Sequence, residues 1–388
     1  MRTEHILRGL AVVSAVRYSC GVDLRWRPVL IRVAMTVEDA VQMVVLLVLR
    51  VRGRHLPMIV PFVGHGTTRR IRVGGRVVRG RPAVEVPAVG VPVAEPPTRR
   101  SRQAVLRSTL ARFLTVEVPR VAVTIDAPGG AESDTTDHDG YLDAVLDVPD
   151  LVPGWHDVGL ALADGTTARA QVLVVDPEAR IGLVSDVDDT IIETGLSRGW
   201  AFLRAALMTE VGDRTPLPGA AALYRALVTP GRPVFYLSTS PWNLHEMLLE
   251  FIVLRRFPLG PMLLTDWGPS RSGLFRIGAQ EHKLGVVRRL LAEHPLLGLV
   301  LVGDSGQADP EIYATLAREH PDRIVAIYIR RTPTATLRRV AEVDALAADV
   351  TAAGVPMLAV DDSVEIAVHA AGLGLLDPAA PAQIRADR

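Results

Sequence analysis

The pattern of hydrophobic residues changes at Arg180, and this change constrains the fold more than any other feature of the sequence. From there on, short apolar runs alternate with segments of helical period. Strands that are separated by helices imply crossover connections and therefore an α/β fold with a mostly parallel sheet in three layers. The expected strands lie at 181–184, 234–237, 262–264, 299–302, 324–329 and 356–360, and the expected helices at about 198–210, 219–228, 242–254, 281–293, 309–319 and 362–372.

The residues before Arg180 follow a different pattern. Apolar and polar residues alternate in several short segments, which predicts strands, and two further segments have helical period. We therefore expect a helix and a small β-sandwich ahead of the α/β part. The expected strands lie near 69–78, 121–125, 141–146 and 168–175, and the expected helices at 36–50 and 102–113. The predicted boundaries give a flexible basic extension over 1–34, the helix and β-sandwich domain over 35–177, the α/β domain over 178–375 and a flexible tail over 376–388.

Composition excludes several classes of protein. Of 388 residues, 48% are hydrophobic and 22% are charged, which is ordinary for a chain that buries a core and argues against a mainly disordered one. Cys20 is the only cysteine, so a disulfide scaffold is excluded. No apolar run approaches the roughly 18–20 residues of a membrane-spanning helix, and the N-terminus makes a poor signal peptide. We therefore expect a cytoplasmic protein.

Charge is unevenly distributed along the chain, although the net charge is zero. Residues 1–120 hold 21 Arg and seven acidic residues, whereas the remainder holds 22 basic and 36 acidic residues. Such asymmetry predicts a basic region that meets an anionic surface, joined to an acidic domain. The alternative is that surface charges drifted apart without a role. The basic residues are 42 Arg and one Lys, so Lys283 is a candidate for a site that needs a compact ammonium.

Two carboxylates follow the first predicted strand of the α/β part. Asp186 and Asp188 are two residues apart, so on an extended chain they project to the same side of the strand end. Active sites of parallel sheets lie at this edge. One carboxylate there can act as nucleophile and metal ligand while the other gives and takes a proton. Alternatively, these residues begin a helix, with Asp189 or Thr190 as its N-cap.

Hydroxyl side chains follow the second predicted strand. Ser238, Thr239 and Ser240 come directly after its last apolar residue. A hydroxyl at a strand end can donate a hydrogen bond to a phosphoryl oxygen, or it can cap the next helix. We select Ser238 for the site because it follows the strand directly, and we assign Ser240 as the helix cap.

Further charged residues follow the fourth predicted strand, and one precedes it. Gly303 lets the backbone turn closely, and Asp304 and Asp309 add two carboxylates. Clustered carboxylate oxygens suit Mg²⁺, although the same residues also fit an ordinary polar turn before Pro310. Lys283 begins a helix between the second and fourth motifs, where a lysine is usually a solvated surface residue. The four motifs in this order indicate an active site more specifically than any one of them does alone.

The order strand–Asp-x-Asp-x-Thr, strand–Ser, Lys and strand–Gly-Asp resembles the signature of the haloacid dehalogenase superfamily of phosphotransferases. More narrowly, residues 180–330 resemble the catalytic domain of the actin-patch-type phosphatidate phosphatase family. A weaker resemblance extends to Pro61–Gly66 and to Gly75–Val78. The stretches that carry the main resemblance are Asp186–Ile192, Phe235–Asn243, His282–Gly285 and Gly303–Tyr313.

The resemblance implies a role for each site residue. Asp186 would attack phosphorus and form an aspartyl-phosphate, and Asp188 would protonate the leaving oxygen and then activate water. Ser238 and Lys283 would hold the transferring phosphoryl group. Mg²⁺ would be held by Asp186, by the main-chain carbonyl of Asp188 and by Asp304, with Asp309 supporting either the metal or Lys283.

The resemblance also implies a Mg²⁺-dependent hydrolase that removes phosphate from a lipid phosphomonoester such as phosphatidate. Only about 45 residues separate the first two motifs, which leaves room for a small cap and so for an open site that suits a lipid headgroup. We expect peripheral contact with an anionic inner membrane face through residues 1–120, and no nucleic-acid partner. Two alternatives stay open, namely a phosphatase of a soluble phosphomonoester and an anionic-surface binding protein with a regulatory phosphatase-like domain.

Overall fold

The computed structural model describes residues 57–79, 116–192, 217–265, 267–270, 273–275 and 278–387. The predicted extension over 1–34 and the predicted helices at 36–50, 102–113 and 198–210 lie outside these residues. The chain comprises two compact units. In the smaller unit, β13 (Trp267–Ser270) and β14 (Gly273–Phe275) pair as an antiparallel hairpin. All the elements below belong to the larger unit, residues 56–265 and 279–388.

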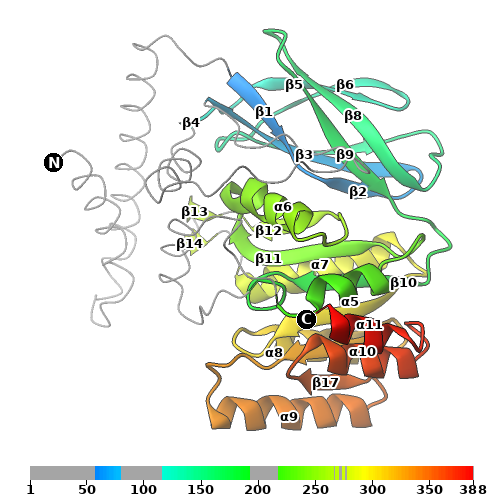
Figure 1. The fold of residues 1–388 in the computed structure, drawn as a ribbon. Helices are drawn as coiled ribbons and strands as arrows, with labels where there is room; N and C mark the ends of the chain where they lie inside the picture. Colours follow the sequence, from blue (N-terminus) through cyan, green and yellow to red (C-terminus); the bar gives the residue numbers. More distant parts are fainter. Residues whose placement is uncertain are drawn as a thin grey trace, which may run out of the picture. The chain divides into compact units, whose positions relative to one another are not determined.

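A six-stranded parallel sheet lies at the centre of the α/β part (Figure 1). Its strands run in the order β12-β11-β10-β15-β16-β17. The strand order reverses between β10 and β15, and in such sheets ligands bind in the crevice at the point of reversal. All six predicted strands are confirmed. Their bounds are β10 (Ile181–Asp186), β11 (Val234–Pro241), β12 (Met262–Thr265), β15 (Gly298–Asp304), β16 (Ile324–Arg330) and β17 (Met357–Val360).

Helices lie between the strands of the parallel sheet and, as α10 and α11, after its last strand. Five of them match predicted helices, and two more, α9 and α11, were not predicted. In α9 the buried residues Val343, Ala347 and Val350 are four and three positions apart, which places them on one face of the helix. The helix bounds are α5 (Ala220–Leu227), α6 (His245–Leu254), α7 (Ala279–Glu293), α8 (Asp309–Glu319), α9 (Leu337–Ala352), α10 (Ser363–Gly372) and α11 (Ala380–Ala386).

Apolar side chains of the strands point alternately to the two faces of the parallel sheet. In β15, Val300 and Val302 belong to the core that also holds residues of α5, α6, α10 and α11. Leu299 and Leu301 belong to the core that holds residues of α7, α8 and α9. Both faces of this strand are therefore buried, which explains why it reads in the sequence as a continuous apolar run.

The C-terminal residues differ from the expected flexible tail over 376–388. They contain α11, on which Ile384 is 1% exposed and packs in the same core as α5 and α10. Burying an isoleucine side chain stabilises a segment by about 1.5–3 kcal/mol. The expectation of a flexible tail is therefore corrected to an ordered helix, because the chain end covers apolar surface that the sequence pattern did not reveal.

Nine strands form a second sheet, which we call the N-terminal sheet (Figure 1). Hydrogen bonds join them in the order β1-β3-β2-β9-β8-β5-β6, and β4 and β7 also pair with the long strand β3. The four predicted strands are confirmed as β3, β5, β7 and β9, and five more accompany them. Their bounds are β1 (Pro57–Pro61), β2 (Gly64–Gly66), β3 (Arg70–Arg79), β4 (Val116–Glu117), β5 (Ala122–Ala127), β6 (Gly130–Thr135), β7 (Tyr141–Asp147), β8 (Gly154–Leu162) and β9 (Thr167–Val174).

Mixed α/β structure with a parallel sheet is established, whereas three finer expectations stay predictions. The strands expected to make a β-sandwich are joined by hydrogen bonds into one sheet. The three-layer arrangement with a small cap is untested, because residues 193–216 lie outside the described ones. The boundary at 177/178 is also untested, because both sheets belong to one compact unit.

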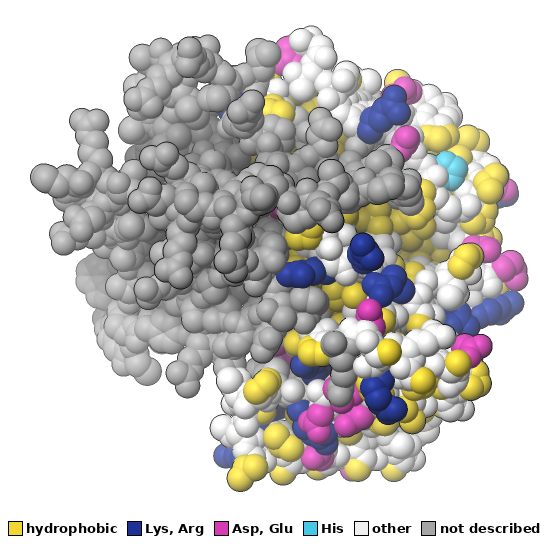
Figure 2. Space-filling model, in the orientation of Figure 1, with side chains coloured by type: hydrophobic (Ala, Val, Ile, Leu, Met, Phe, Trp, Pro, Cys, Tyr) yellow, Lys and Arg dark blue, Asp and Glu magenta, His cyan; other side chains and the backbone are white. Residues whose placement is uncertain are grey.

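Arginines of the N-terminal sheet pair with acidic residues from beyond residue 120. Arg72 Nη1 lies 2.6 Å from Asp143 Oδ1, and Arg69 and Arg70 lie 3.6 and 3.8 Å from acidic residues within 147–150. The charge split along the sequence therefore does not separate two surfaces within this sheet. On the face drawn in Figure 2, basic and acidic side chains likewise lie interspersed. None of the described helices combines the length and the apolar character needed to cross a bilayer.

Candidate active site

An aspartate ends each of the two strands at the point where the strand order reverses. Asp186 is the last residue of β10 and Asp304 is the last residue of β15, and these strands are parallel neighbours. Both side chains are fully buried. The parallel sheet therefore brings together at its carboxyl edge two carboxylates that are far apart in the sequence.

The single lysine of the chain contacts one of these carboxylates. Lys283 lies on α7, and its Nζ is 2.7 Å from Asp186 Oδ1 and 2.5 Å from Asp309 Oδ1. All three side chains are at most 2% exposed. An unpaired charge at this depth is strongly unfavourable, so each of the three charged groups depends on the others. The interpretation of Lys283 as a solvated surface residue is therefore wrong.

Asp309 begins α8 and links the lysine to β15. Its Oδ1 accepts a hydrogen bond from Lys283, and its Oδ2 accepts one from the main-chain N–H of Asp304 at 3.3 Å. Gly303 permits this close approach, because a Cβ at that position would lie 2.6 Å from Asp309 Oδ2 and 2.7 Å from Asp309 Cβ. Any side chain at position 303 would therefore displace Asp309.

One carboxylate oxygen of Asp304 has no hydrogen-bond partner among the residues that the structure describes. Its Oδ1 accepts hydrogen bonds from the main-chain N–H groups of Gly306 and Gln307, at 2.6 and 3.1 Å. Its Oδ2 is buried and has no hydrogen-bond partner among the described residues. Burial, and then the nearby charge of Asp309, raise the pKa of Asp304 to about 7. Buried polar atoms are nearly always satisfied, so this oxygen indicates a place for a ligand.

Asp188 is held by two serines near the end of β11. Ser238 Oγ and Ser240 Oγ both donate to Asp188 Oδ2, at 3.2 and 3.1 Å. The prediction that Ser240 caps the next helix is wrong. A 3-10 turn, η2 (Trp242–Leu244), separates it from α6, which has no side-chain cap. Ser240 therefore lies in the site together with Ser238, and both hold the same carboxylate oxygen.

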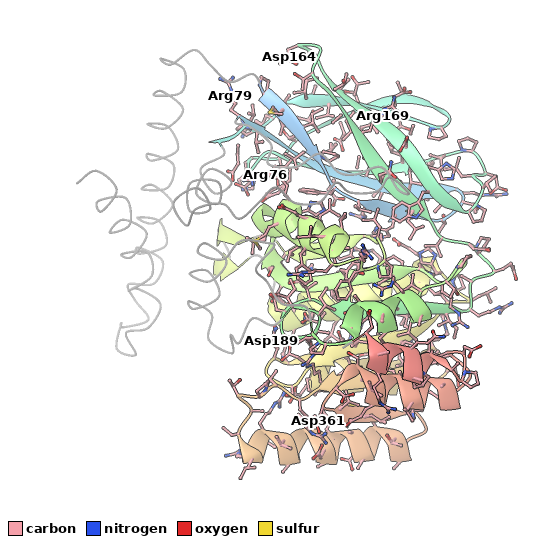
Figure 3. The ribbon with its side chains drawn as sticks, viewed as in Figure 1. Arg76, Arg79, Asp164, Arg169, Asp189 and Asp361 are labelled. Carbon is pink, nitrogen blue, oxygen red and sulfur yellow. The ribbon has the colours of Figure 1, made fainter. Side chains whose placement is uncertain are left out.

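The chain turns sharply after Asp188, at Asp189, which is labelled in Figure 3. Asp189 has a φ of 53°, in the left-handed region that residues other than glycine seldom adopt. The turn brings Thr190 back to the site, where its Oγ1 donates to Asp186 Oδ2 at 3.3 Å. Thr190 was considered only as a helix cap, and its place in Asp-x-Asp-x-Thr is the sequence signal for this contact.

Counted over the described residues, the site has more carboxylates than cationic side chains. Asp186, Asp304 and Asp309 each offer a carboxylate oxygen within 4.8 Å of the others, and Lys283 balances only one of them. Burial raises the pKa of Asp186 well above its usual range, and the Lys283 charge opposes this rise. Burial by itself lowers the pKa of Lys283, but the two carboxylates that it contacts more than offset this and raise it. The lysine is therefore charged. A second cation would balance the remaining carboxylates.

The donor set fits Mg²⁺, which prefers carboxylate and carbonyl oxygens and keeps several waters. The observation that supports the fit is the buried Oδ2 of Asp304 beside Asp186. The carboxylate of Asp188 is not part of this group of three. Asp309 supports Lys283, which is one of the two supporting roles expected for it.

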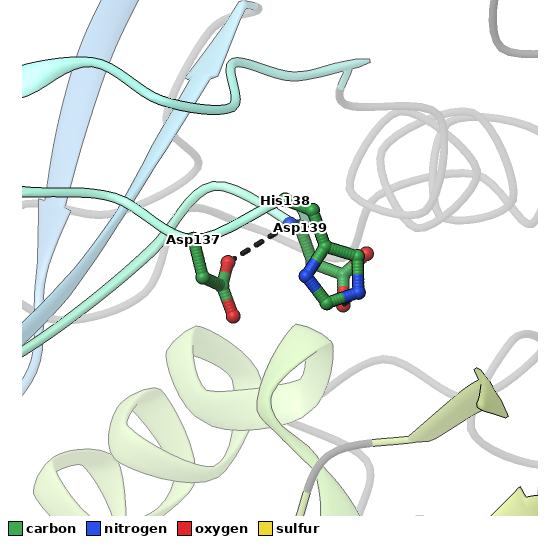
Figure 4. Close-up of side chains that lie close together, drawn as sticks. All are labelled: Asp137, His138 and Asp139. Atoms are coloured by element: carbon green, nitrogen blue, oxygen red, sulfur yellow. Dashed lines mark hydrogen bonds and ion pairs between the residues drawn. The ribbon is translucent and has the colours of Figure 1, made fainter. Parts of the chain in front are cut away.

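A second group of metal-ligand residue types lies in the N-terminal sheet, between β6 and β7 (Figure 4). Asp137 Oδ1 accepts hydrogen bonds from the main-chain N–H groups of Asp139 and Tyr141, at 2.8 and 2.9 Å. His138 Nε2 lies 3.2 Å from Asp139 Oδ2. These are the contacts of a turn that an aspartate side chain stabilises, so we assign no metal to this group.

Two contacts behind the site have no signal in the sequence. Tyr224 on α5 places its hydroxyl 2.6 Å from Ser185 Oγ, which in turn donates to the main-chain O of Asp186 at 2.6 Å. Arg339 on α9 donates to the main-chain O of Ser305 at 2.8 Å and so holds the loop after β15. Both contacts depend on helices that reach the site only through the tertiary fold.

Comparison with known proteins points to one family, and the match covers most of the parallel sheet. Residues 181–331 match the family described as phosphatidate phosphatase APP1, catalytic domain, which confirms the resemblance and its extent. The chain is 28% identical over 239 residues to phosphatidate phosphatase APP1 of Saccharomyces cerevisiae, which is 58% of this chain and 40% of that protein. It is 26% identical over 164 residues to an uncharacterised protein of Schizosaccharomyces pombe, which is 42% of this chain and 26% of that protein. The chain therefore spans less than half the length of these curated relatives.

Among solved structures, a HAD family hydrolase from Deinococcus radiodurans R1 with bound phosphate and sodium covers 52% of this chain and 100% of its own, with a TM-score of 0.31 and 17% identity. A likeness this distant carries no argument about the site.

Proposed function

Starting from the match of residues 181–331 to the phosphatidate phosphatase catalytic-domain family, we propose that this chain is a Mg²⁺-dependent phosphomonoesterase. The observation that carries the proposal is the buried group of Asp186, Lys283 and Asp309 at the carboxyl edge of the sheet, with Asp304 beside it. A carboxylate nucleophile is repelled by a phosphate dianion, so it needs positive charge next to it. Lys283 supplies that charge. We propose with it the three-layer, haloacid dehalogenase-like arrangement with a small cap.

In the first step, a carboxylate oxygen of Asp186 attacks phosphorus and the bond from phosphorus to the ester oxygen breaks. Asp186 then carries the phosphoryl group as an aspartyl-phosphate. Asp188 gives its proton to the leaving oxygen, which departs as an alcohol. Burial raises the pKa of Asp188, opposed by the hydrogen bonds from Ser240 and Ser238, and this rise favours the protonated state that the step needs.

In the second step, water hydrolyses the aspartyl-phosphate. Asp188, now a carboxylate, takes a proton from water while the water oxygen attacks phosphorus. The bond from phosphorus to Asp186 breaks, inorganic phosphate leaves, and Asp188 is protonated again. The hydrogen bonds from Ser238 and Ser240 stabilise the carboxylate form of Asp188 during this half of the cycle.

Mg²⁺ would be held by Asp186, by Asp304 and by the main-chain carbonyl of Asp188. When bound, it supplies positive charge against the phosphoryl oxygens. Asp309 acts from behind, by holding Lys283 in place.

We propose a lipid phosphomonoester, phosphatidate or a close relative, as the substrate. The name of the yeast relative supports this class. The short stretch between the first two motifs supports it too, since a small cap leaves a site open to a bulky lipid.

Phosphate release tests the proposal, with phosphatidate, lysophosphatidate and soluble sugar and aryl phosphates as substrates, each with Mg²⁺ and with a chelator. We expect Mg²⁺-dependent release from the lipids. Asp186→Asn should abolish turnover while circular dichroism stays unchanged. Phosphate release from the soluble esters alone would mean that the substrate is a soluble phosphomonoester and not a lipid. Activity of Asp186→Asn would mean that Asp186 is not the nucleophile.

We also propose that basic residues within 1–120 dock the chain on an anionic membrane at its cytoplasmic face. Arg69 and Arg70 each lie near an acidic residue, so we select other arginines, those within 99–102, as the first candidates for the docking charge. A basic residue near such a surface contributes about 1 kcal/mol, within a Debye length of about 8–10 Å.

Vesicle sedimentation tests the docking. Replacing Arg99, Arg100 and Arg102 by Gln should weaken binding to phosphatidylglycerol vesicles, and added salt should weaken the binding of the unchanged protein. The matched control replaces Arg69 and Arg70 by Gln and should bind as before. Equal binding to neutral phosphatidylcholine vesicles would exclude docking by charge and leave the phosphatase proposal intact.

A further inference from the structure

The segment Pro61–Gly66 has no role in the function proposed above, although it carries part of the weaker family resemblance. Phe62 and Val63 follow β1, and the next three residues form β2. β2 pairs on both sides, antiparallel to β3 and parallel to β9. A Cβ at Gly64 would lie 2.4 Å from the main-chain O of Arg72, so the backbones pack very closely here. The N-terminal sheet therefore holds this segment firmly.

Phe62 reaches from the N-terminal sheet to the start of α6, which lies next to that sheet in Figure 1. Its ring stacks on Trp242, with ring centroids 4.3 Å apart and planes at 12°. Its centroid also lies 4.5 Å from that of His245. Phe62 is 5% exposed, so the contact is shielded from water. An offset or parallel stack of this kind fixes the relative position of two rings.

His245 completes the aromatic group as an uncharged ring. Neither of its ring nitrogens has a hydrogen-bond partner within the described part of the chain. Burial lowers its pKa to about 3, so it is neutral near pH 7. His245 therefore contacts Phe62 and Trp242 through ring packing.

Trp242 directly follows the irregularly paired end of β11, residues 238–241, which we call the serine loop. The last residue of β11 that pairs with β10 is Leu237, and the register with β12 shifts between Leu237 and Pro241. Thr265 Oγ1 donates to the main-chain O of Thr239 at 2.8 Å. Strand pairing is thus interrupted after Leu237 and resumes at Pro241, which pairs with Thr265 and directly precedes the stacked Trp242.

We propose that Phe62 is a positioning residue for the serine loop and acts through its stack on Trp242. This inference rests on the proposed function, because the loop matters through Ser238 and Ser240, which hold Asp188. The N-terminal sheet is then part of the support of the active site and not a separate module. A shift of about 1 Å at a reacting group can lower a rate up to about a hundredfold, so loss of the stack should be visible in kcat.

The test removes the ring and keeps its apolar bulk. Phe62→Leu should lower kcat about tenfold for the phosphomonoester that the unchanged protein hydrolyses best and change KM less than about twofold, since the proton-transfer group is moved and substrate contacts are not. Phe62→Tyr keeps the ring and should retain most of kcat. Trp242→Leu should lower kcat like Phe62→Leu, and the double variant should lose no more than either single one, because both act through one contact.

Leu160→Ala is the matched control for stability. Leu160 lies on β8 in the core of the same sheet and is 1% exposed. Its loss should lower the melting temperature at least as much as Phe62→Leu and leave kcat unchanged. An equal fall of kcat in Leu160→Ala would mean that any destabilisation of the sheet has this effect, and it would overturn the proposal.

Fluorescence gives a readout that does not depend on activity. Phe62→Leu should change the intrinsic tryptophan emission, and the change should vanish in the Trp242→Phe background. An active protein in which Phe62→Leu alters neither kcat nor emission overturns this inference alone. A parent protein without phosphatase activity overturns the proposed function, and the positioning role with it.

Discussion

At the scale of single residues, the site depends on one ammonium group between two carboxylates. Lys283 Nζ lies 2.7 Å from Asp186 Oδ1 and 2.5 Å from Asp309 Oδ1, in a side chain that is 2% exposed. An ammonium has three donors on one compact atom, so two can reach the carboxylates while the third stays available for a phosphoryl oxygen. This geometry gives a reason why a chain with 42 arginines has lysine at this position.

Lys283→Arg should therefore lower kcat at least about tenfold, which corresponds to about 1.4 kcal/mol of barrier. The guanidinium is wider and planar, so it has to displace either Asp186 or the substrate. Steady-state kinetics on the preferred substrate provide the measurement. The matched control is Arg288→Lys on the same helix, where the side chain pairs with Glu319 at the surface. A Lys283→Arg enzyme as active as the Arg288→Lys enzyme would show that the reaction does not need a lysine at this position.

Ser240 provides a second prediction at this scale. Ser240→Ala removes one of two hydrogen bonds to Asp188 Oδ2 and should lower kcat about tenfold, since a bond to a charged group is worth about 1.5–3 kcal/mol. The control is Ser363→Ala, which removes a buried hydrogen bond to the main-chain O of Pro218 away from the site. Both variants should melt at similar temperatures, and only the first should lose activity. Unchanged kcat in Ser240→Ala would show that the hydrogen bond from Ser240 to Asp188 does not contribute to catalysis.

At the scale of elements, the connection from β15 to α8 sets the position of Asp309. A Cβ at residue 303 would lie 2.6 Å from Asp309 Oδ2 and 2.8 Å from Tyr313 Cε2, both on α8. The helix therefore packs against a strand position that has room only for glycine. Since Asp309 holds Lys283, a shift of α8 reaches the phosphoryl site through this ion pair.

Gly303→Ala should consequently lower kcat about tenfold or more and weaken Mg²⁺ binding measured by calorimetry, because α8 and Asp309 have to move. The control is Gly372→Ala at the end of α10, where an added Cβ meets nothing within 4 Å. That variant should keep full activity. A Gly303→Ala enzyme with normal kcat and normal Mg²⁺ affinity would show that the loop adapts without moving Asp309.

At the scale of the whole molecule, three buried histidines link stability to pH. Burial lowers the pKa of His65 and His245 to about 3 and that of His294 to about 4. In the unfolded chain an imidazole titrates near 6.5. As the pH falls below about 6.5, the unfolded state binds protons that the folded state does not bind. The stability contributed by the neutral imidazoles is therefore complete above pH 6.5 and is lost progressively as the pH falls toward 4.

The unfolding free energy measured with urea at pH 7 and at pH 5 also contains the opposite contribution of the buried carboxyls whose pKa is raised. The histidine contribution is therefore taken from the difference between variants, and it should be about 2 kcal/mol for each imidazole. His245→Phe removes one of the three titrating groups and keeps an aromatic ring beside Phe62 and Trp242. It should therefore reduce the loss between the two pH values by about 2 kcal/mol. Leu160→Ala keeps all three imidazoles and should show the same pH dependence as the unchanged protein. Equal pH dependence in His245→Phe would contradict the neutral state of this histidine.

Most of the parallel sheet could be predicted from hydrophobic periodicity. Its six strands and five of its helices were expected, because strands buried on both faces read as apolar runs. The residues that follow these runs, such as Asp186 and Asp304, could be named as site candidates for the same reason, since carboxyl ends of parallel strands share one edge. The C-terminal helix α11 was missed, because its burial depends on apolar surface of α5 and α10 and not on its own composition.

Local pattern and residue chemistry were thus sufficient to predict the strands, the order of the motifs along the chain and the charged groups at the strand ends. They were not sufficient to predict side-chain contacts between residues of separate elements. Ser240 was assigned as a helix cap, because local spacing cannot distinguish a hydroxyl that faces the next helix from one that faces Asp188. The stack of Phe62 on Trp242 joins the connection between β1 and β2 to the 3-10 turn after β11, and hydrophobic periodicity along the chain does not predict it. Such contacts depend on how covered sheet faces pack in three dimensions, which follows from the burial of all elements together.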